Sequence, residues 1–190
     1  RSYAEVQGWL DRAKTVTVYA AGEPIIDEYV WVEPAGKSPK ENLITFTRTG
    51  ERSYPGGVDI LAAHLTEAGT LVGVSHWVPP IVKRRYVQQA FTSKVFSEAI
   101  LPERGNDLPD WHSSAAALAV VLADYGHGVV HDQEEAAAAS RLKWLALTVQ
   151  SNSINWGFNL VTKYPRADYV VLDEQELRLA CCSRHGSIEG

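Results

Sequence analysis

The sequence predicts an α/β protein with a mostly parallel central sheet and a small antiparallel sheet beside it. After residue 55, apolar strand-like segments alternate with helix-like segments, which is typical of βαβ units. Near residues 25–48 and 81–100, polar and apolar residues alternate instead, which is typical of antiparallel strands with one face in water. The 190 residues, of which 45% are hydrophobic and 22% charged, are expected to form one domain over 1–190 with a buried core.

The first third of the chain predicts one helix and three strands. Residues 3–14 place apolar side chains at helical spacing and predict an amphipathic helix. Residues 15–21 are β-branched and apolar, which indicates a buried strand, and residues 25–32 and 43–48 predict two further strands. The loop at 33–40 contains two prolines and separates these two strands.

The rest of the chain alternates between strands and helices. The expected helices follow Pro55-Gly56-Gly57, the capping residue Asp132 and the acidic opening at Asp173. The corresponding ranges are 58–68, 132–143 and 173–181 for the helices, and 70–74, 81–87, 95–100, 115–123, 144–149 and 168–172 for the strands. The segments at about 25–50 and 81–100 are interpreted as a lid over one end of the parallel sheet.

Composition and charge exclude several classes of protein. The net charge is −5 and the longest basic run is Lys83-Arg84-Arg85, so a nucleic-acid partner is not expected. No apolar run approaches the roughly 18 residues of a membrane span, and the first residues do not resemble a secretory signal. The adjacent Cys181 and Cys182 are interpreted as reduced thiols, and a cytoplasmic location is expected. Because methionine is absent, we expect these 190 residues to be part of a longer chain.

Polar residues at the ends of the first predicted strands are candidate ligands for a sugar. The ionised carboxylate of Asp27 is a hydrogen-bond acceptor that could take sugar hydroxyls, or it could simply cap a turn. Gly56 and Gly57 precede a helix and could let the backbone approach a ligand, although an ordinary tight turn would look the same. Lys37 and Asn42 belong to a flexible loop that could close over an anionic or polyhydroxylated substrate, or could merely be solvated.

Two later segments carry the remaining candidate residues. Asp124 and His127 lie in the sequence Asp-Tyr-Gly-His-Gly, where two glycines indicate a tight loop at a strand end. A polar, asparagine-rich loop then leads into the strand at 168–172, which is followed by Asp173 and Glu176. Ligand sites of open α/β sheets lie at such strand ends. Acidic residues in a first helical turn also serve to complement the helix dipole, so both interpretations stay open.

In this order, these motifs resemble the ribokinase/phosphofructokinase-B family of sugar kinases. The resemblance covers roughly residues 15–180 and is most similar to the branch of bacterial heptose kinases and of kinase-like domains fused to nucleotidyltransferases. It implies a ribokinase-like three-layer α/β/α fold, a β lid that often forms a homodimer interface, and transfer of the γ-phosphate of ATP to the hydroxyl of a sugar or sugar phosphate.

The resemblance also implies roles for particular residues. Residues matching the sugar site are Asp27, Lys37, Asn42, Gly56 and Gly57. Residues matching the nucleotide and phosphate site are Asp124, His127, Asp173 and Glu176, and Glu176 is the residue expected to organise Mg²⁺. The family has Asn where this chain has Asp173, so a direct phosphate contact there is not carried over.

The catalytic base is a point of departure from the family. It is an Asp in a Gly-Ala-Gly-Asp motif, which this sequence does not contain. One interpretation is a sugar kinase whose C-terminal part, with the base and most of the adenine pocket, lies beyond these 190 residues. A second is a catalytically inactive sugar-binding or regulatory domain, and a third is an oligomerising structural domain.

Overall fold

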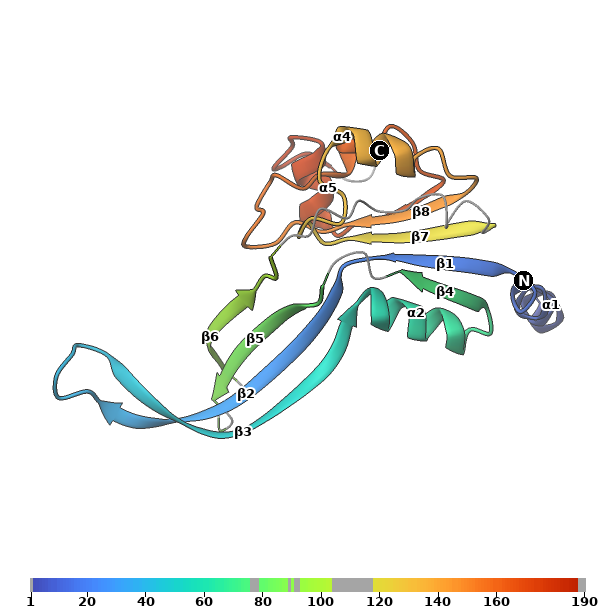
Figure 1. Cartoon of the computed structure of the whole chain (residues 1–190). Helices are drawn as coiled ribbons and strands as arrows, with labels where there is room; N and C mark the ends of the chain where they lie inside the picture. The colour runs from blue at the N-terminus through green and yellow to red at the C-terminus, as the bar shows by residue number, and fades with distance from the viewer. Residues whose placement is uncertain (1, 76–78, 89, 91–92, 104–117, 188–190) are drawn as a thin grey trace.

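The central sheet of the molecule is entirely parallel. The computed structural model describes residues 2–75, 79–88, 90, 93–103 and 118–187. The sheet has the strand order β4-β1-β7-β8-β9 (Figure 1). The strands are β1 (Thr17–Gly22), β4 (Leu71–Ser75), β7 (Ala119–Asp124), β8 (Leu145–Val149) and β9 (Tyr169–Val171). Residues 115–117 of the predicted strand at 115–123 lie outside the described residues.

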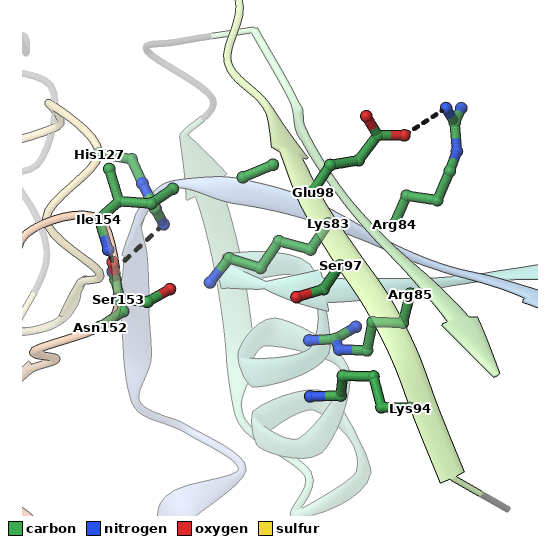
Figure 2. Close-up of a pocket in the computed structure, with 11 residues that line it drawn as sticks. Lys83, Arg84, Arg85, Lys94, Ser97, Glu98, His127, Asn152, Ser153 and Ile154 are labelled. Carbon is green, nitrogen blue, oxygen red and sulfur yellow. Dashed lines mark hydrogen bonds and ion pairs between the residues drawn. The ribbon is translucent and has the colours of Figure 1, made fainter. Parts of the chain in front are cut away.

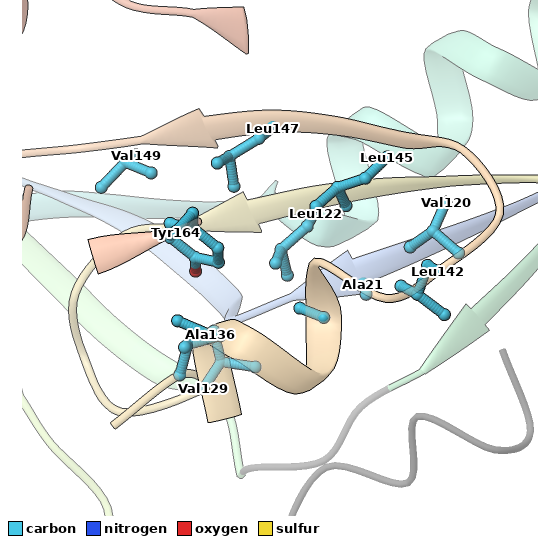
Figure 3. Close-up of a cluster of buried hydrophobic side chains, with 12 residues drawn as sticks. Ala21, Val120, Leu122, Val129, Ala136, Leu142, Leu145, Leu147, Val149 and Tyr164 are labelled. Atoms are coloured by element: carbon cyan, nitrogen blue, oxygen red, sulfur yellow. The ribbon is translucent and has the colours of Figure 1, made fainter. Parts of the chain in front are cut away.

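Helices cover both faces of this sheet, which makes three layers (Figure 1). Helix α2 (Val58–Glu67) packs Val58 and Ala62 against Ala20 of β1. On the opposite face, α4 (Gln133–Ala139) and the short 3-10 helix η2 (Val161–Lys163) cover the larger core, and α5 (Glu174–Ala180) lies on the same side. Figure 3 shows this core, in which leucine and valine side chains from β7 and β8 meet α4. The predicted α/β/α class is therefore confirmed.

Helix α4 is shorter than the predicted 132–143. Asp132 caps it as expected, accepting hydrogen bonds from the backbone N–H groups of Glu134 and Glu135, each at 2.9 Å. The helix ends at Ala139 because the following carbonyls have other partners. The Arg166 guanidinium donates to the Ser140 carbonyl at 3.1 Å and to the Leu142 carbonyl at 2.9 Å. The sequence of the alanine run does not indicate the contacts with Arg166, so it could not predict where the helix ends.

The second sheet has the order β3-β2-β5-β6 and projects from one end of the central sheet. Its strands are β2 (Pro24–Lys37), β3 (Ile44–Gly57), β5 (Ile81–Gln88) and β6 (Ser93–Ile100). The pairs β2/β3 and β5/β6 are antiparallel as predicted, but β2 and β5 run parallel. The lid is therefore a mixed sheet. Between β3 and β5 the chain passes through α2 and β4. It then returns to the second sheet, where β5 pairs with β2.

Strand β3 is longer than the predicted 43–48, because it pairs along the length of β2. Its last residues, Gly56 and Gly57, lie beside Ile25 and Pro24. They are therefore strand residues leading directly into α2, and the interpretation as a free-standing tight turn is wrong. Alternation is weak in the second half of β3, so only the long-range pairing reveals the strand.

A single residue, Glu23, connects β1 of the central sheet to β2 of the second sheet. β1 ends at Gly22, β2 begins at Pro24, and Glu23 lies between them. Gly22 has φ of +152°, and a Cβ there would lie 2.3 Å from the Ala123 carbonyl oxygen. A side chain is therefore excluded at this crossing, where the lid leaves the core.

The N-terminal helix α1 (Tyr3–Ala13) forms as predicted, but its apolar face is not covered. Ser2 and Glu5 make a reciprocal capping box, which explains where the helix begins. None of its residues is buried, so its amphipathic pattern serves no core in the described part of the chain. No helix among the described residues is both long enough and apolar enough to cross a membrane.

Candidate functional site

Glu23 organises the carboxyl end of the central sheet. Its side chain is fully buried and accepts hydrogen bonds from three backbone N–H groups of the loop after β7. These are Tyr125 at 2.8 Å, His127 at 2.9 Å and Val129 at 3.2 Å. The residue at the lid junction therefore fixes a loop about a hundred positions later. Sequence reasoning missed Glu23, although it lies just past the end of the predicted strand at 15–21.

The charge of Glu23 is opposed by its surroundings. Burial, followed by the nearby Asp124 carboxylate, raises the pKa of Glu23 to about 7, whereas the three N–H donors act to lower it. Two carboxylates buried side by side disfavour ionisation together. The hydrogen bonds to both Glu23 oxygens compensate part of that cost.

Asp124 is also fully buried, and its carboxylate is engaged on every side. One oxygen accepts hydrogen bonds from the Gly126 N–H at 3.0 Å and from Asn159 Nδ2 at 3.2 Å. The other accepts from the Tyr164 hydroxyl at 2.7 Å and lies 2.6 Å from Lys163 Nζ. Asp124 thus shapes the loop after β7, and its predicted contact with phosphate stays a prediction.

Two asparagines from the loop after β8 donate hydrogen bonds to the backbone of the loop after β7. Asn152 Nδ2 donates to the Tyr125 carbonyl at 2.8 Å. Asn155 Nδ2 donates to the carbonyls of Tyr125 at 3.1 Å and Gly126 at 3.2 Å. The asparagine-rich composition signalled a polar loop, but only the fold shows that it meets the Asp-Tyr-Gly-His-Gly segment.

Asp27, Gly56 and Gly57 lie together at the base of the lid, as predicted. A Cβ on Gly56 would lie 2.5 Å from Asp27 Oδ2, so the glycine makes room for the carboxylate. Gly57 has φ of +59° and is the N-cap of α2 without a side-chain cap. The Arg85 guanidinium pairs with Asp27 Oδ1 at 2.5 Å. A half-buried carboxylate therefore faces the start of a helix.

Lys37 and Asn42 do not join this group. They lie at the tip of the β2–β3 hairpin, which projects away from α2 (Figure 1). Lys37 lies ten positions beyond Asp27 along β2, a distance of roughly 33 Å in an extended strand. Both residues are exposed, and both border two hollows at the hairpin tip.

A cleft of about 270 Å³ separates the lid from the loops of the central sheet. One wall comprises residues of β5 and β6, and the other comprises His127 and residues 152–154 (Figure 2). The cleft is rich in cationic side chains from the lid. Asp27 borders a neighbouring hollow with Tyr29, and Arg85 links the two hollows by its ion pair.

The titration of the groups around this cleft reflects burial and mutual repulsion. Burial lowers the pKa of Lys83, with attraction to Asp27 acting against that effect and Arg85 reinforcing it. Burial and the Lys83 charge lower the pKa of His127 to about 4, although Asp124 opposes this. His127 is therefore a neutral imidazole at pH 7.

Asp173 and Glu176 form a capping box at the start of α5. Asp173 accepts from the Glu176 N–H at 2.7 Å, and Glu176 Oε2 accepts from the Asp173 N–H at 2.9 Å. Glu176 Oε1 also accepts from the Ser151 N–H at 3.2 Å. Within the described part of the chain, no group of three or more acidic, histidine or cysteine residues could hold a metal. The Glu176 carboxylate keeps acceptor capacity for water around Mg²⁺, so the residues fit an indirect role only.

These features define the class of fold: a ribokinase-like α/β protein with a lid beside the carboxyl end of its parallel sheet. Three solved structures with this fold are titled as a carbohydrate kinase or a ribokinase. The ribokinase of Arabidopsis thaliana, complexed with ribose and ATP, matches with a TM-score of 0.55 and 14% identity over 87% of this chain and 62% of that one. A carbohydrate kinase from Agrobacterium tumefaciens gives 0.54 and 12% identity over 87% and 63%. The ribokinase of Thermotoga maritima gives 0.52 and 15% over 86% and 61%.

This likeness establishes the fold and no more than the fold. No known family model matches the chain, and no curated protein matches it. The chain spans less than two thirds of the length of each of these three kinases.

Proposed function

We propose that this chain carries the sugar-binding and lid-bearing part of an ATP-dependent carbohydrate kinase. The observation that carries the proposal is the juxtaposition of Asp27 with Gly56, Gly57 and the N-terminus of α2, which has no side-chain cap. A carboxylate accepts hydrogen bonds from sugar hydroxyls, and Gly56 leaves room for the Asp27 carboxylate. The fold of the solved sugar kinases adds support, because all of the matched structures named above are described as kinases of this kind.

The remaining candidate residues have more distant roles in this proposal. The loop of Asp124 and His127 and the α5 cap of Asp173 and Glu176 would lie toward the phosphates and Mg²⁺ of ATP. Support comes from ribokinases solved with bound nucleotide, the Arabidopsis enzyme with ATP and a Cryptococcus neoformans enzyme with ADP. Catalysis of phosphoryl transfer depends on positioning and charge stabilisation, which these fixed loops would provide.

Assembly is also part of the proposal. The lid presents exposed strands, and a second copy of this chain covering them would bury their apolar side chains, including Phe46 and Phe96. In such a homodimer, the remote Lys37 and Asn42 would reach the partner copy. A tetrameric phosphofructokinase-2 of Escherichia coli shares the fold, with a TM-score of 0.51. A heptose-kinase-like specificity and a nucleotidyltransferase partner remain predictions.

A second candidate is a sugar-binding domain without catalysis. The engagement of Asp124 by Gly126, Asn159, Lys163 and Tyr164 favours it, because that carboxylate has little capacity left for a nucleotide. The use of Asp173 as a helix cap favours it too.

Calorimetric titration of the full polypeptide with a panel of sugars tests the sugar site. Asp27→Asn is expected to weaken sugar binding at least ~10-fold, because a charged hydrogen bond contributes about 1.5–3 kcal/mol. Glu28→Gln is the matched control, since Glu28 also pairs with an arginine of β5, Arg84, and is expected to bind sugar normally. Equal affinity in wild type and Asp27→Asn would remove Asp27 from the site.

Measurement of ADP release in the presence of Mg²⁺ and the bound sugar separates the two candidates. Sugar-dependent ADP release supports the kinase. Sugar binding without ATP binding supports the non-catalytic domain.

A further inference from the structure

The cleft between the lid and the central sheet carries a concentration of positive charge. Alternation along β5 turns Lys83 and Arg85 to the same face, and Lys94 joins them from β6 (Figure 2). All three side chains extend toward the loops that carry His127 and Asn152. Three cations from two neighbouring strands therefore face one cavity of about 270 Å³.

Carboxylates neutralise only part of this charge. Arg84 and Glu98 also border the cleft, but their side chains extend away from Lys83, Arg85 and Lys94 (Figure 2). Arg84 pairs there with Glu98 at 2.9 Å and with Glu28. Arg85 pairs with Asp27 at 2.5 Å. Lys83 and Lys94 have no ion pair with any described residue. The face directed at the cleft thus keeps an excess of positive charge.

The facing wall holds one neutral hydrogen-bonding atom without a partner among the described residues, His127 Nδ1. Asn152 Nδ2 lies 3.4 Å from His127 Nε2, and the same nitrogen donates to the Tyr125 carbonyl. His127 Nε2 then acts as the acceptor, which leaves the proton on Nδ1. His127 Nδ1 is buried and has no hydrogen-bond partner in the described residues. A buried donor without an acceptor is costly and rare in proteins.

We propose that this cleft binds the anionic group, a phosphate or a carboxylate, of an acidic sugar substrate. The inference rests on the proposed function and narrows its substrate class. An anion between Lys83 and Lys94 would relieve the repulsion among the lid cations and could accept a hydrogen bond from the opposite wall. The sugar is favoured over ATP as its source, because the cations belong to the lid and Arg85 contacts Asp27 directly.

Matched pairs of sugars test the proposal by calorimetry at low salt, where exposed charges are least screened. The probes are ribose with ribose 5-phosphate, fructose with fructose 6-phosphate, glucose with gluconate, inorganic phosphate, and ATP without metal. For at least one pair, the charged member is expected to bind about 10- to 100-fold more tightly, the range of one or two charge-assisted hydrogen bonds. Preference for a phosphate ester or for gluconate identifies the source of the anion.

The double variant Lys83→Gln/Lys94→Gln is expected to abolish that preference while leaving binding of the uncharged sugar within a few-fold. Lys143→Gln, an exposed lysine near the end of α4, is the matched control for loss of positive charge. Circular dichroism and the urea midpoint confirm folding, and each single variant is measured if the double variant does not fold.

The outcomes separate this inference from the proposed function. Asp27-dependent binding of uncharged sugar, with no gain from the anionic group, overturns the anion site and leaves the sugar site standing. Phosphate binding that depends on the two lysines, without any sugar binding, supports the anion site and overturns the sugar site. If the Lys83→Gln/Lys94→Gln variant loses binding of ATP alone, the anion bound in the cleft is not that of a sugar, and the proposal is overturned.

Discussion

At the scale of single residues, the loop after β7 depends on glycine at position 126. Gly126 has φ of +71°, and a Cβ there would lie 1.9 Å from Asn155 Nδ2 and 2.8 Å from Asn159 Nδ2. The two asparagines therefore approach the loop only because this residue has no side chain. The sequence suggested a tight loop at this point, but it could not show what the glycine accommodates.

The substitution Gly126→Ala is expected to destabilise the protein by about 2–4 kcal/mol, the sum of left-handed backbone strain and overpacking. Gly157→Ala is a matched control, since Gly157 has φ of +75° and open space where its Cβ would be. It should cost only the backbone term, about 1–2 kcal/mol. Urea unfolding of both variants measures the difference. Equal losses would mean that the asparagines move aside freely.

At the scale of elements, the lid is held by charges that cross three strands. Glu28 of β2, Arg84 of β5 and Glu98 of β6 form one network of ion pairs. Because side chains alternate along a strand, Arg84 and Lys83 lie on opposite faces of β5. The sequence could not predict the partners, because β2 and β5 are brought together only by the parallel crossover.

Replacing Arg84 with Gln is expected to loosen the lid while sparing the core. These side chains are partly exposed, so the loss should be about 0.5–1 kcal/mol. Hydrogen exchange followed by mass spectrometry should show faster exchange in β5 and β6 and unchanged protection in β7 and β8. A uniform increase across both sheets would indicate that the lid and core unfold as one unit.

At the scale of the whole molecule, stability is coupled to pH through His127. Its pKa is about 4 in the folded protein, against an ordinary value of 6.5. The unfolded chain therefore takes up a proton below pH 6.5 while the folded protein does not, so stability is lost as pH falls from about 6.5 to 4. Glu23 acts in the opposite sense: its raised pKa, about 7, removes stability as pH rises from its ordinary value of 4.5 to about 7.

Comparison of wild type with His127→Asn isolates the histidine from the glutamate. Between pH 7.5 and 5, the wild type should lose about 1 kcal/mol more than the variant, a figure reduced for the partial exposure of the ring. The free energies of unfolding in urea at the two pH values provide the test. Parallel pH curves for the two proteins would show that His127 is not held neutral by the fold.

The residue patterns by themselves determined the α/β class and the alternating elements after residue 55. These features depend on local periodicity and on short stretches of chain, which a sequence displays directly. Tertiary structure alone decided the burial of Glu23, the length of β3 and the separation of Lys37 from Asp27. It also decided the gathering of Lys83, Arg85 and Lys94 opposite His127. Each of these depends on which distant strands pair and in which register, and no local pattern encodes that pairing.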